Sequence, residues 1–264
     1  MIDLNYISGF FAAPLRENPD LAKHIVKEYI QLMVLDFLST TSYMRKMTFI
    51  GGTNLRLIKR IDRFSEDLDF DIHDMSEEEF MSMTDDVITF LKRSGLNAEA
   101  KDKKNPKLTA FRRNIIFPQL LFDLNLSGHK EERFLLKVEA QEQGVDYEPV
   151  TVNVSGCGFF FSLPVPPDGV LLSMKLSALL RRAKGRDFYD TMFLLGQTQP
   201  DYAFLEKRSG IGSALILKEA IGKLLQETDL NVKKRDFEHL LFSKFNSEKI
   251  LRFDEFIEAN LKIS

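Results

Sequence analysis

Three acidic residues, Asp67, Asp69 and Asp71, alternate with apolar residues in one short stretch of the sequence. Strict alternation predicts a half-buried strand, and residues two apart on a strand share a face. The three carboxylates would therefore point to one side, while Leu68, Phe70 and Ile72 enter a core. Adjacent carboxylates repel one another unless they share a proton or a cation. A divalent ion such as Mg²⁺, which takes one or two carboxylates with phosphate oxygens and water, fits such a strand.

A glycine turn precedes the acidic strand. Gly51 and Gly52 are followed by Thr53 and by a segment that we expect to be helical, Asn54 to Ile61. Glycine lets the backbone approach a ligand closely, and a helix N-terminus offers free N–H groups to an anion. Either feature alone is common in structural roles. Together they predict a site in which one element holds a triphosphate and the next holds its metal ion.

Two amphipathic helices are expected around this motif. The first covers residues 20–43, with Asp20 as a possible cap and apolar residues at helical spacing. The second covers residues 76–94. Ser76 and Glu79 stand three residues apart at its start, which is the pattern of a capping box.

The pattern then changes to short strands up to about residue 161. The expected strands are 97–103, 109–117, 120–126, 133–140, 150–154 and 158–162. Glu139 ends the apolar strand 133–140, where a buried carboxylate without a partner would be costly. Lys137 would share the face of Glu139. Asp123, in the expected strand 120–126, is the rival acidic residue.

A proline-rich segment, residues 164–167, breaks the β region and predicts a boundary between residues 1–163 and a helical domain at residues 164–264. The next expected helix, from Val170 to Lys184, is apolar nearly all round and therefore buried. Lys175 lies in its middle. A buried lysine needs an anionic partner or loses its charge, and a bound triphosphate would supply one. A lysine that extends to the surface is the alternative.

The densest positive cluster in the chain follows this helix. It consists of Arg181, Arg182, Lys184 and Arg186. The cluster is either a solvated helix end or a contact for a polynucleotide. A further helix then begins, with Asp187 and Asp190 in its first turn, where acidic residues are favoured by the helix dipole.

Composition indicates a folded protein without special covalent stabilisation. The chain has 264 residues, a formal net charge of −3 and one cysteine, Cys157. The single cysteine excludes a disulfide framework and a cysteine-based zinc site. The net charge gives no global signal for nucleic acid, so such a contact would need a local basic patch. We find no signal peptide and no apolar run that could span a bilayer, so we expect a cytoplasmic protein without membrane contact.

The motif stretch resembles the AbiEii/AbiGii toxin family, within the DNA polymerase β-like nucleotidyltransferase superfamily. That family has a Gly-Gly-Thr/Ser turn and then an Arg-x-Ser-x-Asp-x-Asp strand. The matching positions here are Gly51, Gly52, Thr53, Arg63, Ser65, Asp67 and Asp69. A second signature matches at Lys175 and at Arg186, Asp187 and Asp190. The resemblance extends from about residue 46 to residue 195.

The resemblance implies an α+β fold, with a mixed nucleotidyltransferase sheet flanked by helices and a helical C-terminal domain. It implies that Asp67, Asp69 and Glu139 hold Mg²⁺ or Mn²⁺, with Asp123 as the rival of Glu139 for the third carboxylate. It also implies that these three residues and Lys175 are the catalytic residues. The residues expected to bind the NTP are Gly51, Gly52, Thr53, Arg63, Ser65, Lys175, Asp187 and Asp190. The residues expected to bind RNA are Arg181, Arg182 and Lys184.

The implied reaction moves an NMP from an NTP to an acceptor hydroxyl. The resemblance further implies a toxin that acts on RNA at the tRNA 3′ end and that has a separate protein antitoxin. Two alternatives stay open: a small-molecule nucleotidyltransferase of the aminoglycoside type, and a non-catalytic NTP-binding protein of the same fold. Fold alone does not separate these functions. The intact acidic strand favours catalysis, because unused carboxylates there would only repel.

Overall fold

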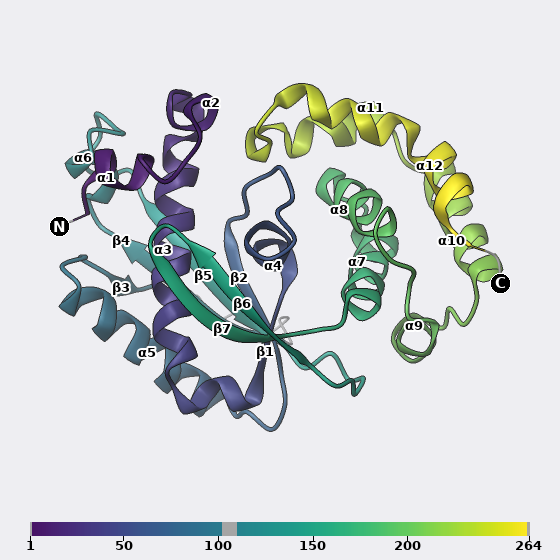
Figure 1. The fold of residues 1–264 in the computed structure, drawn as a ribbon, viewed down its shortest axis with the longest axis horizontal. Helices are drawn as coiled ribbons and strands as arrows, with labels where there is room; N and C mark the ends of the chain where they lie inside the picture. The colour runs from purple at the N-terminus through teal and green to yellow at the C-terminus, as the bar shows by residue number, and fades with distance from the viewer. Residues whose placement is uncertain (1, 102–109, 263–264) are drawn as a thin grey trace. The chain divides into compact units, whose positions relative to one another are not determined.

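The computed structural model describes residues 2–101 and 110–262, and these form two compact units (Figure 1). The first unit contains Met1–Arg60, Phe64–Glu142 and Thr151–Val165. The second contains Ile61–Arg63, Gln143–Val150 and Pro166–Ser264. The division that we expect after residue 163 stays a prediction.

A five-stranded mixed sheet forms the centre of the first unit, in the order β1-β2-β5-β4-β3. Only the β2–β5 pair is parallel among the paired strands of this sheet in the described residues. The strands are β1 (Met47–Ile50), β2 (Asp67–Ile72), β3 (Glu99–Ala100), β4 (Phe111–Phe117) and β5 (Phe134–Ala140). This mixed sheet agrees with the expected α+β class.

One face of the sheet is apolar and buried. Leu68 and Phe70 of β2 and Leu136 and Val138 of β5 lie in one core, together with residues of two long helices, α3 (Ala22–Ser39) and α5 (Glu77–Arg93). On the opposite face, Asp67 and Asp69 of β2 and Lys137 and Glu139 of β5 are half-buried and charged. Alternation therefore separates a core face from a face that is available for chemistry.

Both expected helices of this unit are confirmed. The capping box of α5 is complete, because the Ser76 hydroxyl accepts a hydrogen bond from the Glu79 amide (3.1 Å) and the Glu79 carboxylate accepts one from the Ser76 amide (3.1 Å). Shorter helical segments fill the N-terminal part and the approach to β1. They are α1 (Leu4–Ser8), α2 (Ala13–Arg16), η1 (Pro19–Leu21) and η2 (Ser42–Lys46).

The motif helix begins earlier than expected. We expect a helix from Asn54 to Ile61, but α4 is Gly51–Leu57, so the glycine pair belongs to its first turn. The backbone leaves β1 at Ile50, and Gly51 takes a φ of +83°, a conformation that glycine adopts without the steric cost of a side chain. The helix therefore starts directly at the end of a strand.

The strand expected at residues 120–126 is wrong, because this segment forms a short helix, α6 (Leu120–Asp123). Consecutive apolar residues, Leu120 and Leu121, lack the alternation that a half-buried strand requires, and both are buried by a helical turn. Gln119 begins the turn with a φ of +60°. Of the expected strand 97–103 only β3 forms, and residues 102–109 lie outside the described residues.

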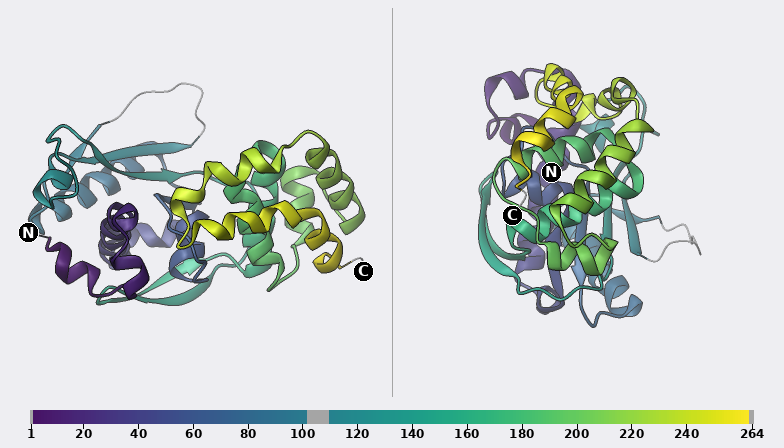
Figure 2. Two further views of the ribbon diagram at one scale, coloured as in Figure 1. Left: turned by 90° about the horizontal axis from the view of Figure 1, so that it is seen from above. Right: turned by 90° about the vertical axis from the view of Figure 1, so that its right-hand side faces the viewer.

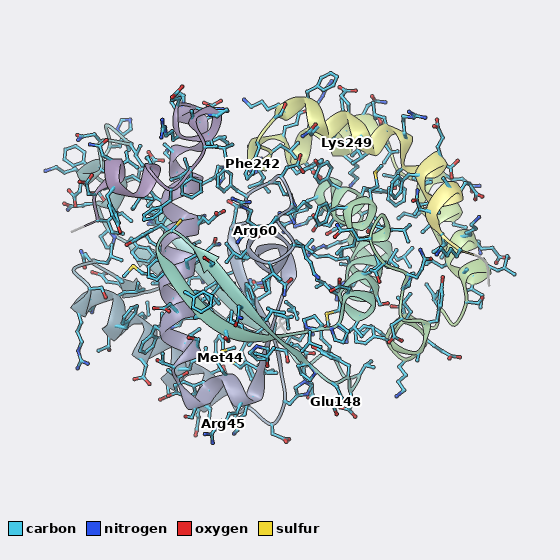
Figure 3. All side chains as sticks on the ribbon, in the orientation of Figure 1. Met44, Arg45, Arg60, Glu148, Phe242 and Lys249 are labelled. Atoms are coloured by element: carbon cyan, nitrogen blue, oxygen red, sulfur yellow. The ribbon has the colours of Figure 1, made fainter. Side chains whose placement is uncertain are left out.

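A two-stranded hairpin completes the first unit. It contains β6 (Val150–Gly156) and β7 (Phe159–Val165), each longer than the expected strands 150–154 and 158–162. The hairpin packs with β7 against α3, as the left view of Figure 2 shows. Arg60, labelled in Figure 3, donates a hydrogen bond to the Ser155 carbonyl (2.7 Å) and ties the end of the motif helix to the hairpin.

Helices dominate the second unit, drawn from green to yellow in Figures 1 and 2. They are α7 (Asp168–Arg182), α8 (Gly185–Leu195), α9 (Tyr202–Ser209), α10 (Ala214–Gln226), α11 (Leu230–Lys233) and α12 (Phe253–Asn260). Three 3₁₀ segments join them, η3 (Lys234–Asp236), η4 (Glu238–Leu240) and η5 (Lys244–Arg252). No helix in residues 2–101 and 110–262 is long and apolar enough to cross a membrane.

Candidate active site

The start of the motif helix touches the acidic strand. A Cβ placed on Gly51 would lie 2.2 Å from the Asp69 Oδ2 atom, far closer than real contacts allow. The reason is the antiparallel pairing of β1 with β2, which sets Ile50 opposite Asp69. The Gly51 backbone and the Asp69 carboxylate therefore lie side by side. The expected joint site for phosphate and metal requires such proximity.

A buried polar frame supports this junction. The Thr53 hydroxyl donates to the Asp67 carbonyl (2.5 Å), and the Gln31 side-chain amide donates to the Ser65 carbonyl (3.1 Å). Thr53 is fully buried and Ser65 is 7% exposed. The Thr53 side chain thus joins the motif helix to β2. The sequence did not indicate Gln31.

The half-buried face of the sheet alternates acidic and basic residues. The register pairs Asp67 with Lys137 and Asp69 with Glu139. The Lys137 ammonium lies 2.9 Å from Asp67 Oδ2 and 3.8 Å from Glu139 Oε1. On the neighbouring strand β4, the Arg112 Nε lies 2.6 Å from Glu139 Oε1. Two cations therefore offset the repulsion among the carboxylates, and Arg112 is a residue that sequence reasoning missed.

Asp71 differs from the other two acids of β2. It is fully buried opposite Thr48, whereas Asp67 and Asp69 are partly exposed. The sequence places the three carboxylates on one side of the strand, and Asp71 differs from the other two in its burial. Asp71 pairs with Thr48 of β1, and the His73 Nε2 atom lies 3.9 Å from its Oδ2 atom.

The residues at this face fit a magnesium ion that arrives with nucleotide phosphates. No group of three His, Cys, Asp or Glu side chains is gathered for a metal anywhere in residues 2–101 and 110–262. Mg²⁺ needs only one or two protein carboxylates when phosphate oxygens and water complete its shell. Asp67 and Asp69 supply hard oxygen donors on one strand face, next to the backbone of Gly51.

The structure separates the two rivals for the third carboxylate. Glu139 lies opposite Asp69 in the parallel strand pair. Asp123 lies on α6 and not on a strand of the sheet. This placement favours Glu139 as the acidic residue that acts with Asp69.

A second cluster of charged side chains lies in the second unit and is almost completely buried. Arg63 Nε and Nη2 donate to the two Asp190 carboxylate oxygens, both at 2.7 Å, and Lys175 Nζ donates to Asp190 Oδ2 at 2.8 Å. Arg63 is 1% exposed, Asp190 0% and Lys175 8%. Lys175 therefore has an anionic partner within the protein, the Asp190 carboxylate. The sequence alone did not determine this partner.

The environment of Asp190 lowers its pKa. Burial alone would raise the pKa, but the charges of Arg63 and Lys175 and their hydrogen bonds outweigh burial and bring it to about 2. The carboxylate therefore stays ionised at neutral pH and holds both cations in place.

The acidic residues at the start of α8 have separate partners. Asp187 is fully buried and accepts hydrogen bonds from Arg182 Nε (2.9 Å), Arg182 Nη2 (2.8 Å) and the Lys184 amide (3.2 Å). Of these two acidic residues, only Asp190 forms hydrogen bonds with Lys175 and Arg63 among the described residues. Asp187 thus orders the basic segment, a role that the sequence did not indicate.

Asp62 is a further residue that sequence reasoning missed. Its carboxylate accepts hydrogen bonds from the Tyr189 hydroxyl (2.8 Å) and the Asn246 amide (2.6 Å). Lys249, labelled in Figure 3, lies over the Tyr189 ring and 3.9 Å from Asp62 Oδ2. These contacts, with the Arg63–Asp190 pair, fix residues 61–63 of the motif stretch within the second unit.

Comparison with protein families matches residues 34–259 to the nucleotidyl transferase AbiEii toxins of type IV toxin–antitoxin systems. Because this match covers most of the chain, the protein belongs to that family. It is therefore a nucleotidyltransferase, and its family implies an NTP substrate. Comparison with curated proteins finds no match.

Solved structures with the same fold include nucleotidyltransferase toxins. MenT4, a nucleotidyltransferase toxin from Mycobacterium tuberculosis H37Rv, is 17% identical over 98% of this chain and 90% of its own, with a TM-score of 0.61. JHP933 from Helicobacter pylori is 17% identical over 89% and 90%, with a TM-score of 0.54. A candidate nucleotidyltransferase from H. pylori is 18% identical over 89% and 93%, with a TM-score of 0.58. These likenesses confirm the expected fold.

Replacement of Gly51 tests the junction between helix and strand. We expect Gly51→Ala to destabilise the fold by about 1 kcal/mol or more, because alanine is strained at positive φ and its Cβ would displace Asp69. Thermal or denaturant unfolding measures the effect. Gly144→Ala is the control, since Gly144 also has positive φ but open space around it. Equal losses in the two variants would show that the contact with Asp69 has no energetic weight.

The pKa of Asp190 predicts a loss of stability in acid. The folded-state pKa lies below the ordinary 3.8, so the ionised group stabilises the fold above about pH 4, and this contribution of about 2 kcal/mol disappears as the pH falls towards 2. Asp190→Asn should lower the free energy of unfolding by about 3–5 kcal/mol at pH 7, because it leaves two buried cations uncompensated. Urea unfolding across this pH range measures both effects. A variant as stable as the wild type at pH 7 would contradict the assignment.

Proposed function

We propose that this nucleotidyltransferase moves an NMP from an NTP to a hydroxyl of RNA, at the tRNA 3′ end, with Mg²⁺ or Mn²⁺ and release of pyrophosphate. The observation that supports this proposal is the position of Asp69, which lies against Gly51 on one side and pairs with Glu139 on the other. Phosphate-binding backbone, metal-binding carboxylate and a second carboxylate are thereby brought together within one unit.

The residues of the first unit have separate tasks in this reaction. Asp67 and Asp69 would hold the metal ion, which when bound neutralises phosphate charge and stabilises the attacking and leaving oxygens. Gly51 and Gly52 admit the β and γ phosphates to the start of α4, where backbone N–H groups are free to donate. Glu139 would accept the proton of the acceptor hydroxyl, with Arg112 and Lys137 holding its carboxylate in place.

The roles in NTP binding that we assign to Arg63, Ser65, Lys175, Asp187 and Asp190 rest on family membership. In the structure, Asp190 holds Lys175 and Arg63 in ion pairs, and these two side chains are 8% and 1% exposed. Ser65 contributes through the frame that fixes β2.

The wider setting follows from the toxin family. We propose that a separate protein antitoxin controls this enzyme, and that the reaction occurs in the cytoplasm, where NTPs and tRNA are present. Arg181, Arg182 and Lys184 are the proposed contacts to RNA.

The proposal is tested by incubation with each labelled NTP, Mg²⁺ and total RNA. We expect label in RNA with the wild type and none with Asp67→Ala or Asp69→Ala. Stability should change by no more than about 1 kcal/mol in Asp67→Ala, because the Asp67–Lys137 pair is partly exposed. Asp71→Ala should retain more transfer, since Asp71 is buried away from the open face. Full activity in both alanine variants would contradict the metal assignment, and label on an added aminoglycoside but not on RNA would indicate a small-molecule acceptor.

The third carboxylate is tested in the same assay. Glu139→Gln should reduce the rate of transfer by 10²-fold or more, as expected for a general base, and should leave NTP binding intact. Asp123→Asn, on α6, is the matched control and should leave the rate unchanged. The assignment would be wrong if the control lost activity and Glu139→Gln did not.

A further inference from the structure

We propose that two basic segments of the second unit, residues 181–186 and 233–235, form one surface that binds the phosphate backbone of the RNA acceptor. The inference rests on the proposed function, in which RNA is the substrate. The first segment is the cluster already noted in the sequence. The second consists of Lys233, Lys234 and Arg235, which nothing in the sequence connects with the first.

The two segments are in direct contact through Gly185. The Gly185 amide donates to both carboxylate oxygens of Asp236, at 3.1 and 3.0 Å. A Cβ placed on Gly185 would lie 1.9 Å from the Lys233 carbonyl oxygen. Only glycine permits this approach, so the residue between the basic side chains of the first segment is also the contact point for the second.

The backbone that presents these charges is rigid. Helix α7 ends at Arg182, Ala183 takes a φ of +45°, and α8 begins at Gly185. The buried Asp187 carboxylate holds both the Arg182 guanidinium and the Lys184 amide. A basic segment on a flexible loop would lose conformational entropy when it binds RNA, whereas most of that cost is avoided here.

The charge balance leaves several cations available for phosphate. Arg182 pairs with Asp187, and Lys234 pairs with Glu248. Five further basic residues form no ion pair with any described residue: Arg181, Lys184, Arg186, Lys233 and Arg235. Three of these five, Lys184, Arg186 and Arg235, lie on either side of Gly185 or next to Asp236, whose carboxylate accepts a hydrogen bond from the Gly185 amide.

Acidic residues border this surface on one side. A pocket of about 450 Å³ lies between the end of α7 and the connection from α10 to α11, and its lining includes Arg181, Lys233, Glu227 and Asp229. The pocket lining, which also includes Arg182, therefore carries charges of both signs, whereas the charged residues of the two basic segments are all positive. The backbone of RNA is therefore expected to follow the basic segments and not to enter the pocket.

The test measures binding of bulk tRNA to the full chain by fluorescence anisotropy at several KCl concentrations. Each phosphate contact contributes about 0.7 to 0.9 to the slope of log K against log salt concentration. Lys233→Gln with Arg235→Gln should therefore weaken tRNA binding at low salt and reduce the slope by about 1.4 to 1.8. The control is Lys207→Gln with Lys262→Gln, two exposed lysines of the same unit, which should leave the slope unchanged.

A second variant tests the contact without removing charge. Gly185→Ala keeps every basic side chain but must push the two segments apart, so tRNA affinity should fall. Gly222→Ala is its control, because a Cβ on Gly222 meets nothing within 4 Å. Thermal unfolding shows whether Gly185→Ala is folded. If it is not, the charge variant alone decides.

The outcomes separate this inference from the proposed function. The composite surface would be overturned if the double variant Lys233→Gln with Arg235→Gln had the same salt slope as the control. It would also be overturned if the wild-type protein bound no tRNA at low salt. Binding of labelled NTP, measured separately, should be unchanged in all these variants. If no NMP is transferred to RNA but the slope falls as expected, the proposed reaction fails and the RNA surface stands.

Discussion

The parallel pairing of β2 with β5 is the constraint on which the rest of the candidate site depends. It brings Asp69 beside Glu139, and Asp67 beside Lys137, across a separation of 70 residues. Carboxylates this close together would destabilise the sheet without compensation. Lys137 and Arg112 offset this repulsion, because their positive charges alternate with the acidic side chains on one face of the sheet. Stability of the sheet and readiness for a cationic ligand thus arise from the same arrangement.

Glycine is required where backbone and carboxylate meet. The antiparallel β1–β2 pair places the end of one strand against Asp69, and the helix must begin at that point. A side chain at Gly51 would fill the space of the Asp69 carboxylate. This explains why a glycine pair and an acidic strand occur together, and it connects the geometry with the nucleotidyltransferase family to which the chain belongs.

Buried charge has a second role in the helical unit. Asp190 neutralises Arg63 and Lys175, and Asp187 orders Arg182 and the backbone that follows. Ions in such surroundings are costly unless each has a partner with good geometry, and here each partner is supplied from a different segment. The basic segments that meet at Gly185 are held by the same means, because Asp187 and Asp236 both accept bonds from their backbone.

Local patterns in the sequence determined a large part of this protein. Alternation predicted β2, and the Ser76–Glu79 spacing predicted the start of α5. The glycine pair indicated a helix nearby, although that helix begins at Gly51 and not at Asn54. These features depend on neighbours within a few residues, so the sequence alone specifies them. The misassigned strand at 120–126 is the instructive exception, since an apolar run without alternation suits a helix as well as a strand.

Tertiary structure decided every feature that joins distant segments. The partner of Lys175, the position of Glu139 opposite Asp69, the ion pair of Arg112 with Glu139 and the contact of Gly185 with Lys233 all depend on strand register or helix packing. Periodicity shows which face of an element is polar, but it does not show which other element lies against that face. Asp71 is the clearest case, because alternation places it on the same side as Asp67 and Asp69 but does not show that its side chain is fully buried.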